Sequence, residues 1–281
     1  MLLYKRDFRL SHLLKIVSIL GSAASPLLLR ALRKGPLTAF EFSWRTLEVY
    51  QELIQNQPIP GATLLQLGAA QMGDQRIWMD LSQPSSEMPP GELAVLCSLV
   101  KWKNPQVVVE IGTFKGLTTL HLSKNTSDTC HIYTVDLPPE AAKDPSIFSD
   151  PQLVQKATKT ERAYGNDPKI TQILQDSTTI EWGKILDRPV DFAFVDASHL
   201  YHHVRGDTEG ILKVLAPEGV VVWHDYRPVE IRRGVKKYLV ELHNQGMPLK
   251  HLVNTSFCVY QRAESGRYSP NLEASISVSA A

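Results

Sequence analysis

The sequence predicts an α/β protein whose sheet is mostly parallel, doubly wound and finished by an antiparallel hairpin. Short apolar runs alternate with helical stretches along the middle of the chain, which is typical of a parallel sheet covered on both faces. The expected strands are Val107–Ile111, His131–Val135, Ile170–Leu174, Phe192–Val195 and Val220–Trp223, and the expected helices are Thr118–Lys124, Asp150–Tyr164, Tyr201–Leu215 and Val229–Asn244. The pattern then changes, because Lys250–Val253 and Phe257–Gln261 are separated only by Asn254–Ser256. Such a short connection indicates a hairpin and not a further crossover.

The chain of 281 residues divides into three parts by composition. Residues 1–89 are expected to form a helical extension and a connector: Phe42–Asn56 has helical apolar spacing, and residues 59–91 are rich in Pro, Gly, Ser and Gln. That connector is interpreted as a linker or site cover and not as core. Residues 90–262 carry the alternating pattern and form the expected ligand-binding domain. Residues 263–281 are small and polar and are expected to be disordered.

The charge distribution is uneven. The net charge is +1, which gives no reason to expect a nucleic-acid partner. Residues 1–35, however, carry seven basic residues against one acidic residue. The apolar run Ile16–Leu29 inside this segment is short for a membrane span. We expect a helical extension that supports contacts in a homo-oligomer or touches a membrane surface, with a cleaved secretory leader as the alternative.

Cysteine usage indicates a reducing compartment. Cys97, Cys130 and Cys258 are odd in number, lie in apolar segments and form no C-x-x-C pair. We therefore expect three buried, reduced thiols in a cytoplasmic protein, with peripheral membrane contact through the basic N-terminus as the variant.

Polar residues follow the first three expected strands. Gly112 and Gly116 form a turn in which the backbone can approach a ligand and a helix can present free N–H groups. Asp136 ends the second strand, where a carboxylate can accept hydrogen bonds from both hydroxyls of a ribose. Asp176 and Ser177 follow the third strand and could bond adenine. Ligands of open α/β sheets bind at these strand ends, so we expect a nucleoside cofactor. A structural glycine turn and a turn aspartate are the alternatives.

Three motifs give the chain a resemblance to a known family. They are Glu110-Ile-Gly-Thr-x-x-Gly116, Phe194-Val-Asp-x-x-His-x-Tyr201 with Val204-Arg-x-Asp207, and Leu215-x-Pro-x-Gly-Val-Val-Val-Trp-His-Asp225. Residues 107–226 resemble class I S-adenosylmethionine (SAM)-dependent methyltransferases. The group is often called methyltransferase family 24 and includes macrolide-sugar O-methyltransferases and cephalosporin hydroxylase-like proteins. The resemblance covers less than half of the chain.

The resemblance implies a Rossmann-like class I methyltransferase fold with SAM as the cofactor. The methionine end of SAM would lie over the glycine turn and its neighbouring acid, and the ribose and adenine would lie at the next two strand ends. The implied cofactor-binding residues are Glu110, Gly112, Thr113, Gly116, Asp136, Asp176, Ser177 and Asp196. The terminal hairpin distinguishes this fold from that of nucleotide dehydrogenases.

The fourth and fifth strands end in acids, Asp196 and Asp225, so both carboxylates should point into one cleft. Such oxygen ligands suit Mg²⁺ or another divalent cation, with His224 as the expected third ligand and His199 as the other candidate. His199 is also the candidate general base, because an imidazole titrates near neutral pH, and we place Asp225 with it in the catalytic set. The alternatives are that Asp225 caps the next helix and that His224 is a core histidine. Ser198 stands where several relatives have an acidic base, which excludes carboxylate catalysis from that position.

The expected function is SAM-dependent O-methylation of a small hydroxylated molecule such as a sugar, a polyketide or a phenolic compound. One alternative is a protein of the same fold with other chemistry or none. A second is an NAD-dependent oxidoreductase. Asp136 alone would permit it, but the chain lacks the G-x-G-x-x-G motif of such enzymes. The third is a non-enzymatic module tethered by the basic N-terminus, and the acids on three strand ends argue against it.

Overall fold

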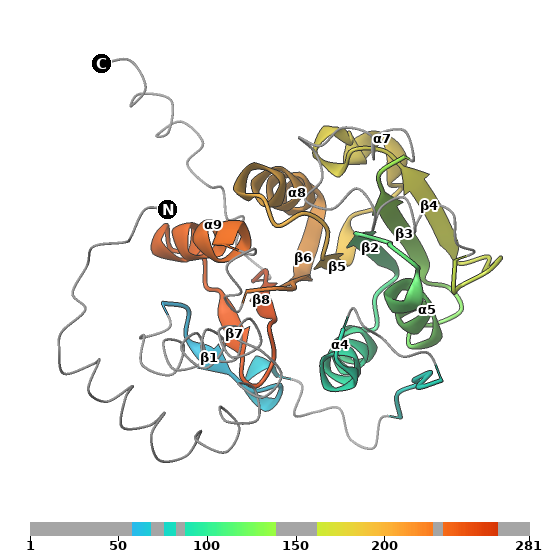
Figure 1. Ribbon diagram of the computed structural model, residues 1–281, viewed down its shortest axis with the longest axis horizontal. Helices are drawn as coiled ribbons and strands as arrows, with labels where there is room; N and C mark the ends of the chain where they lie inside the picture. Colours follow the sequence, from blue (N-terminus) through green and yellow to red (C-terminus); the bar gives the residue numbers. More distant parts are fainter. Residues whose placement is uncertain (1–57, 69–75, 83–87, 139–161, 227–232, 264–281) are drawn as a thin grey trace, which may run out of the picture. The chain divides into compact units, whose positions relative to one another are not determined.

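The computed structural model describes residues 58–68, 76–82, 88–138, 162–226 and 233–263 (Figure 1). The chain divides into two compact units, Met1–Gln57 and Pro58–Ala281, and all described residues belong to the second. The expected N-terminal extension, including the helix at Phe42–Asn56, and the expected disordered tail from residue 264 lie outside the described residues.

The described domain is built on one sheet of eight strands in the order β1-β7-β8-β6-β5-β2-β3-β4 (Figure 1). The strands are β1 (Gly61–Ala62), β2 (Val107–Ile111), β3 (His131–Asp136), β4 (Ile170–Leu174), β5 (Val190–Val195), β6 (Leu215–Trp223), β7 (Lys250–Leu252) and β8 (Cys258–Gln261). Strands β2 to β6 pair in parallel, whereas β8 runs antiparallel to both β6 and β7. The predicted doubly wound sheet with its terminal antiparallel hairpin is confirmed.

Helices cover both faces of this sheet. They are α4 (Pro90–Lys103), α5 (Leu117–Lys124), α7 (Trp182–Ile185), α8 (Tyr201–Val214) and α9 (Arg233–Asn244), with 3-10 turns η1 (Leu65–Leu67) and η4 (Ser177–Thr179). Alternate side chains of a strand point to opposite faces, and the core is accordingly divided into two clusters. Val108 belongs to the cluster that contains Leu96 of α4, and Val109 belongs to the cluster that contains Ile211 of α8 and Leu239 of α9.

The position of the central strand β2 explains why its sequence is almost continuously apolar. All five of its residues are buried, because β2 has a strand on each side and helices over each face. Glu110 is the one acid in this strand, and it is fully buried. A carboxyl group in such surroundings needs local hydrogen-bond donors, and these define one end of the site described below.

The compact domain begins earlier than the sequence indicates. Gly61 of β1 pairs in parallel with His251 of β7, and Ile59 and Met88 are buried in the two core clusters. The interpretation of residues 59–91 as a connector without core residues is therefore wrong at these positions. The helix expected over Asp150–Tyr164 lies mainly outside the described residues, and its described end at 162–164 is a turn.

The buried, reduced state expected for the cysteines is confirmed, since Cys97, Cys130 and Cys258 are all buried and free. In the part of the chain that the structure describes, no helix has the length and hydropathy needed to cross a membrane.

The glycines of the β2–α5 turn are required by the protein's own packing. Gly112 has φ +107°, and a Cβ there would lie 2.1 Å from the carbonyl oxygen of Asp196. Gly116 has φ +75°, and a Cβ there would lie 2.6 Å from the ring of Tyr164. The sequence suggested that Gly112 makes room for a ligand; the structure shows that the chain following β5 fills this space.

Gly112→Ala should therefore destabilise the domain by about 2–5 kcal/mol, the sum of backbone strain at positive φ and a clash with backbone. Urea denaturation followed by circular dichroism measures the change. Gly91→Ala in α4 is the matched control, because a Cβ there would have no neighbour within 4 Å. That control should be neutral or more stable by up to about 1 kcal/mol. Equal stabilities for the two variants would contradict the packing.

Candidate functional site

The predicted site residues lie together where the parallel strands end. The glycine turn follows β2, Asp136 ends β3, Asp196 follows β5, and His224 and Asp225 follow β6. Backbone hydrogen bonds hold these ends together: the Gly112 amide donates to Val135, and the Asp196 amide donates to Ile111. The carboxyl edge of the sheet is therefore a rigid frame for the side chains it carries.

Glu110 is a buried acid with one satisfied and one unsatisfied oxygen. Its Oε2 accepts hydrogen bonds from the hydroxyls of Thr119 and Thr134, each at 2.5 Å. Its Oε1 is buried and has no hydrogen-bond partner. Burial raises the pKa of Glu110 to about 8, although the two threonine hydroxyls oppose the shift. Glu110 therefore holds a proton at neutral pH. Because Oε2 already accepts two hydrogen bonds, Oε1 carries this proton and becomes a free acceptor when the carboxyl ionises.

Asp136 is paired with Arg162, a residue that no local sequence pattern singles out. Its Oδ1 accepts from the Leu137 amide at 3.0 Å, and its Oδ2 accepts from Arg162 Nη2 at 3.2 Å. Burial raises the pKa of Asp136, and the Arg162 guanidinium opposes that shift. Arg162 belongs to none of the three motifs and precedes β4 by eight positions, so no local pattern marked it.

Asp176 and Ser177 are both engaged within the protein. Asp176 caps η4, where its Oδ1 accepts from the amide and hydroxyl of Thr178 at 2.9 and 2.7 Å. The Ser177 hydroxyl donates to Asp207 of α8 at 2.5 Å. Burial raises the pKa of Asp207 to about 7. The placement of Asp176 and Ser177 at an adenine edge stays a prediction.

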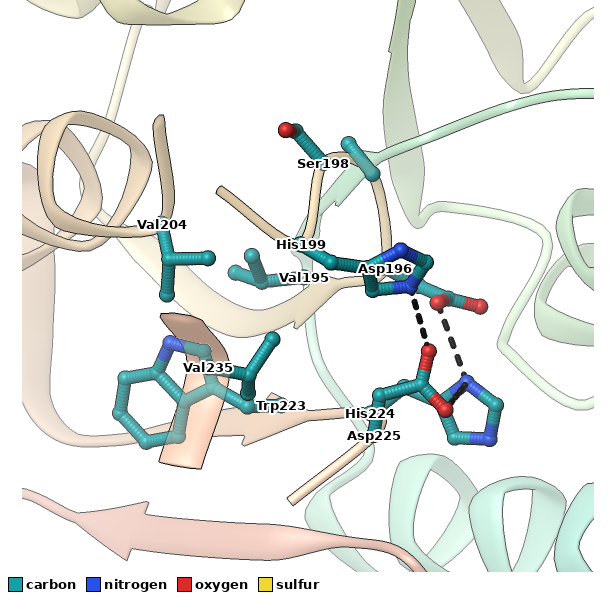
Figure 2. A pocket seen from close by; sticks show the side chains of 10 residues that line it. Val195, Asp196, Ser198, His199, Val204, Trp223, His224, Asp225 and Val235 are labelled. Atoms are coloured by element: carbon teal, nitrogen blue, oxygen red, sulfur yellow. Dashed lines mark hydrogen bonds and ion pairs between the residues drawn. The ribbon is translucent and has the colours of Figure 1, made fainter. Parts of the chain in front are cut away.

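His224 lies among three carboxylates. Its Nδ1 is 3.0 Å from Asp196 Oδ1 and 3.4 Å from Asp225 Oδ1 (Figure 2). Its Nε2 is 3.0 Å from Glu92 Oε2. Both ring nitrogens face carboxylate oxygens, so both carry hydrogens and the ring is an imidazolium. Burial disfavours this charge, but the carboxylates outweigh burial and raise the pKa of His224 to about 10.

The charged His224 changes the expected ligand set. A metal ligand needs a free lone pair on nitrogen, and both nitrogens of His224 face carboxylates. The expectation that His224 is the third metal ligand is therefore corrected by its geometry. His199 is better placed than His224 for such a role, because donor atoms of Asp196, His199 and Asp225 all lie within 4.8 Å of one another.

The side chains of His199 and Asp225 form a short hydrogen bond. The distance from His199 Nε2 to Asp225 Oδ2 is 2.6 Å (Figure 2). Asp225 is 3% exposed and has φ +63°, so its backbone holds an unusual conformation that turns the carboxylate toward the two histidines. The residues that follow it, 227–232, lie outside the described residues, so the helix-cap alternative is not decided there.

Glu92 is a second functional residue that the sequence did not reveal. It lies in the first turn of α4, and its carboxylate also accepts from the Ser256 amide at 2.6 Å and from the Ser256 hydroxyl at 3.0 Å. Although burial would raise the pKa of Glu92, its contacts with His224 and Ser256 lower it overall. Glu92 thus ties α4 and the turn before β8 to the end of β6.

A small pocket opens beside the His199–Asp225 pair. Apolar side chains form one side of it and polar side chains the other (Figure 2). Its lining residues are Val195, Asp196, Ala197, Ser198, His199, Val204, Trp223, His224, Asp225 and Val235. The loop carrying His199 is held from behind by α9, since a Cβ at Gly234 would lie 2.2 Å from the His199 carbonyl oxygen. The arrangement places a candidate base and candidate cation ligands beside a small, partly apolar pocket.

Comparison with known proteins identifies the domain. Residues 109–226 match the family model described as a methyltransferase domain. This part of the chain is therefore similar to methyltransferase domains. A curated protein of Mycolicibacterium vanbaalenii named "Putative O-methyltransferase" is 28% identical over 137 residues, which is 48% of this chain and 54% of that protein. The chain thus spans about half the length of this curated relative.

Solved structures of methyltransferases are also similar to the chain. The O-methyltransferase from Bacillus cereus in complex with S-adenosylhomocysteine (SAH) is 16% identical, with 77% of this chain and 97% of that chain covered and a TM-score of 0.45. The O-methyltransferase TomG from Streptomyces achromogenes in complex with SAM is 17% identical, with 78% and 96% covered and a TM-score of 0.44.

The charged state of His224 predicts a pH-dependent stability. The folded pKa of about 10 lies above the unfolded value of 6.5, so the contribution is complete below pH 6.5 and is lost as the pH rises through 10. His224→Asn should lower the free energy of unfolding by about 3–5 kcal/mol at pH 6.5, because it leaves buried carboxylates without a cation. Urea denaturation at pH 6.5 and 10 measures this difference.

The variant should approach the wild type at the higher pH. His202→Asn is the matched control, because His202 is exposed on α8 and should leave both curves unchanged. If the difference between His224→Asn and wild type were the same at both pH values, a neutral His224 would follow.

Proposed function

We propose that this protein transfers the methyl group of SAM to a hydroxyl oxygen of a small metabolite. The observation that carries the proposal is the buried, unpartnered Oε1 of Glu110 inside the matched methyltransferase domain. A buried acceptor without a partner costs free energy, and a ligand that brings a donor removes that cost. The sulfonium of SAM supplies an electrophilic methyl group. The protein therefore mainly binds and orients the acceptor and removes the proton of its hydroxyl group.

The residues at the end of β2 and β3 fit SAM in charge and hydrogen bonding. Glu110 is an acceptor for the ammonium of the methionine part, and Asp136 is an acceptor for the ribose hydroxyls. Thr113 joins the same network, since its hydroxyl lies 2.6 Å from that of Thr134. The remaining proposed contacts are those implied by the family resemblance: Gly112, Gly116, Asp176, Ser177 and Asp196.

His199 is the group we assign to the acceptor proton. Because its Nε2 is bonded to Asp225, its Nδ1 is the nitrogen left to take a proton from a hydroxyl. Asp225 fixes the orientation of the ring and would stabilise the imidazolium that forms. The catalytic pair that we propose is therefore His199 and Asp225.

The same side chains also fit a divalent cation. Two carboxylates and an imidazole with donor atoms within 4.8 Å of one another suit Mg²⁺ or Mn²⁺. Such an ion, when bound, lowers the pKa of an acceptor hydroxyl. In this proposal Asp196, His199 and Asp225 hold the ion, and His224 stays a fixed cation behind them.

The pocket favours a small organic acceptor such as a sugar, polyketide or phenolic compound. The supporting observation is that apolar side chains, among them the buried Val204 and Val235, line the pocket beside His199.

SAH binding tests the cofactor assignment. Glu110 is protonated at pH 7, and an ammonium beside it favours the ionised form, so binding should release a proton. SAH affinity should therefore rise from pH 6.5 to about 8. Calorimetry in two buffers of different ionisation enthalpy counts the released protons.

Glu110→Gln should weaken SAH binding by about 1.5–3 kcal/mol at pH 8 and abolish the proton release. Asp167→Asn, away from the strand ends, is the control and should change neither quantity, because Asp167 bonds Ser123 of α5. Proton release that persists in Glu110→Gln would show that another group contacts the ammonium.

A second experiment addresses the cation. Mn²⁺ should raise the melting temperature of the wild type, because a ligand that binds only the folded state stabilises it. Asp225→Asn should lose this response. Asp176→Asn is its control, since asparagine caps η4 as well as aspartate does. No Mn²⁺ response in the wild type would leave proton transfer to His199 and Asp225 alone.

A further inference from the structure

Arg162 is a nearly buried arginine with an unused donor. Its side chain is 13% exposed, and its Nη2 bonds Asp136 at 3.2 Å. Its Nη1 is buried and has no hydrogen-bond partner. A buried amino group without an acceptor is costly, about 1–3 kcal/mol and more for a charged group. A purely structural ion pair would be expected to satisfy this group from within the protein.

The segment that carries Arg162 is fixed to the glycine turn. The Ala163 amide donates to the Lys115 carbonyl at 2.9 Å, and the Tyr164 ring packs on Gly116. Gln172 of β4 adds a second anchor: with its amide oxygen toward Arg162, it accepts from Nη2 and Nε at 3.2 and 3.3 Å. Two nitrogens of the guanidinium, Nη2 and Nε, therefore have hydrogen-bond acceptors, and Nη1 has none.

Two atoms without hydrogen-bond partners belong to the residues around Asp136. Among the described residues, four buried side-chain atoms lack a partner, and two of them are Glu110 Oε1 and Arg162 Nη1. Oε1 becomes an acceptor when Glu110 ionises and Nη1 is a donor, and both side chains interact electrostatically with Asp136. A ligand with a donor at one end and acceptors at the other would satisfy both.

We propose that Arg162 is a positioning residue for the nucleoside part of the cofactor. Its Nη2 orients the Asp136 carboxylate for the ribose hydroxyls, and its Nη1 donates to an acceptor atom of the bound nucleoside. This inference rests on the proposed SAM site and adds a residue outside its motifs. Arginine suits this role because its planar fork binds two acceptors in fixed directions, which lysine cannot do.

The test separates the two ends of the cofactor. Two probes are titrated calorimetrically, SAH and 5′-methylthioadenosine, which has the same nucleoside but no amino acid. Arg162→Met should weaken both by about 10–100-fold, the loss expected for charge-assisted hydrogen bonds. Glu110→Gln should weaken SAH and leave methylthioadenosine unchanged. The contrast between the two variants separates the nucleoside end from the amino-acid end, and the melting temperature of Arg162→Met must stay near that of the wild type for its loss to count as a loss of contacts.

Three further variants complete the design. Arg162→Lys keeps the charge and should give an intermediate loss. In an Asp136→Asn background, Arg162→Met should cost less than it does alone, because the two residues act together. Arg205→Met is the matched control, since Arg205 pairs with Glu209 on α8 and should leave both affinities unchanged.

The outcomes are distinct. If wild type binds SAH and Arg162→Met binds both probes as tightly, the inference is overturned and the SAM site stands. If Arg162→Met loses SAH but keeps methylthioadenosine, Arg162 does not serve the nucleoside and the inference is again overturned. If wild type binds neither probe, the proposed function fails and the inference fails with it. The melting temperatures of Arg162→Met and Arg162→Lys show whether a loss of binding is a loss of folding.

Discussion

The buried imidazolium of His224 is the interaction on which the arrangement of the site depends. It brings Glu92 of α4, Asp196 after β5 and Asp225 after β6 to one place, where these carboxylates would otherwise repel one another. Through Glu92 the same cation reaches Ser256 before β8. The helix and the hairpin that flank the matched region, 109–226, are thereby joined to the strand ends inside it.

The edge of the sheet has two chemically different halves. At β2 and β3, Glu110 and Asp136 offer acceptors and Arg162 a donor, which suits recognition of a cofactor. At β5 and β6, His199 and Asp225 offer proton transfer or cation binding. The halves meet where the Asp196 carbonyl lies against Gly112, so their spacing is fixed by backbone contact and not by flexible side chains. Such a fixed spacing keeps reacting groups aligned.

Much of the fold and the positions of the strand-end residues could be predicted from the sequence, because they depend on local patterns. The bounds of β2 and β4 match those expected, since a buried strand between polar turns is a contiguous signal. Glu92 and Arg162 could not be predicted, because their roles depend on partners far along the chain. The choice between His199 and His224 also required geometry: in sequence both are histidines near strand ends, and only the carboxylates around His224 distinguish them.

The contact between Gly234 and the His199 loop limits how such a protein can diversify. The glycine lies inside α9, where an alanine would favour the helix, yet a Cβ would press on the backbone of His199 and Tyr201. A lineage that acquires a new acceptor therefore has little freedom to widen the pocket by changing this helix start. Variation is channelled to side chains whose replacement leaves the backbone in place, such as the buried Val204 and Val235 that line this wall. The side chains that carry the chemistry would then stay the same while the substrate specificity changes.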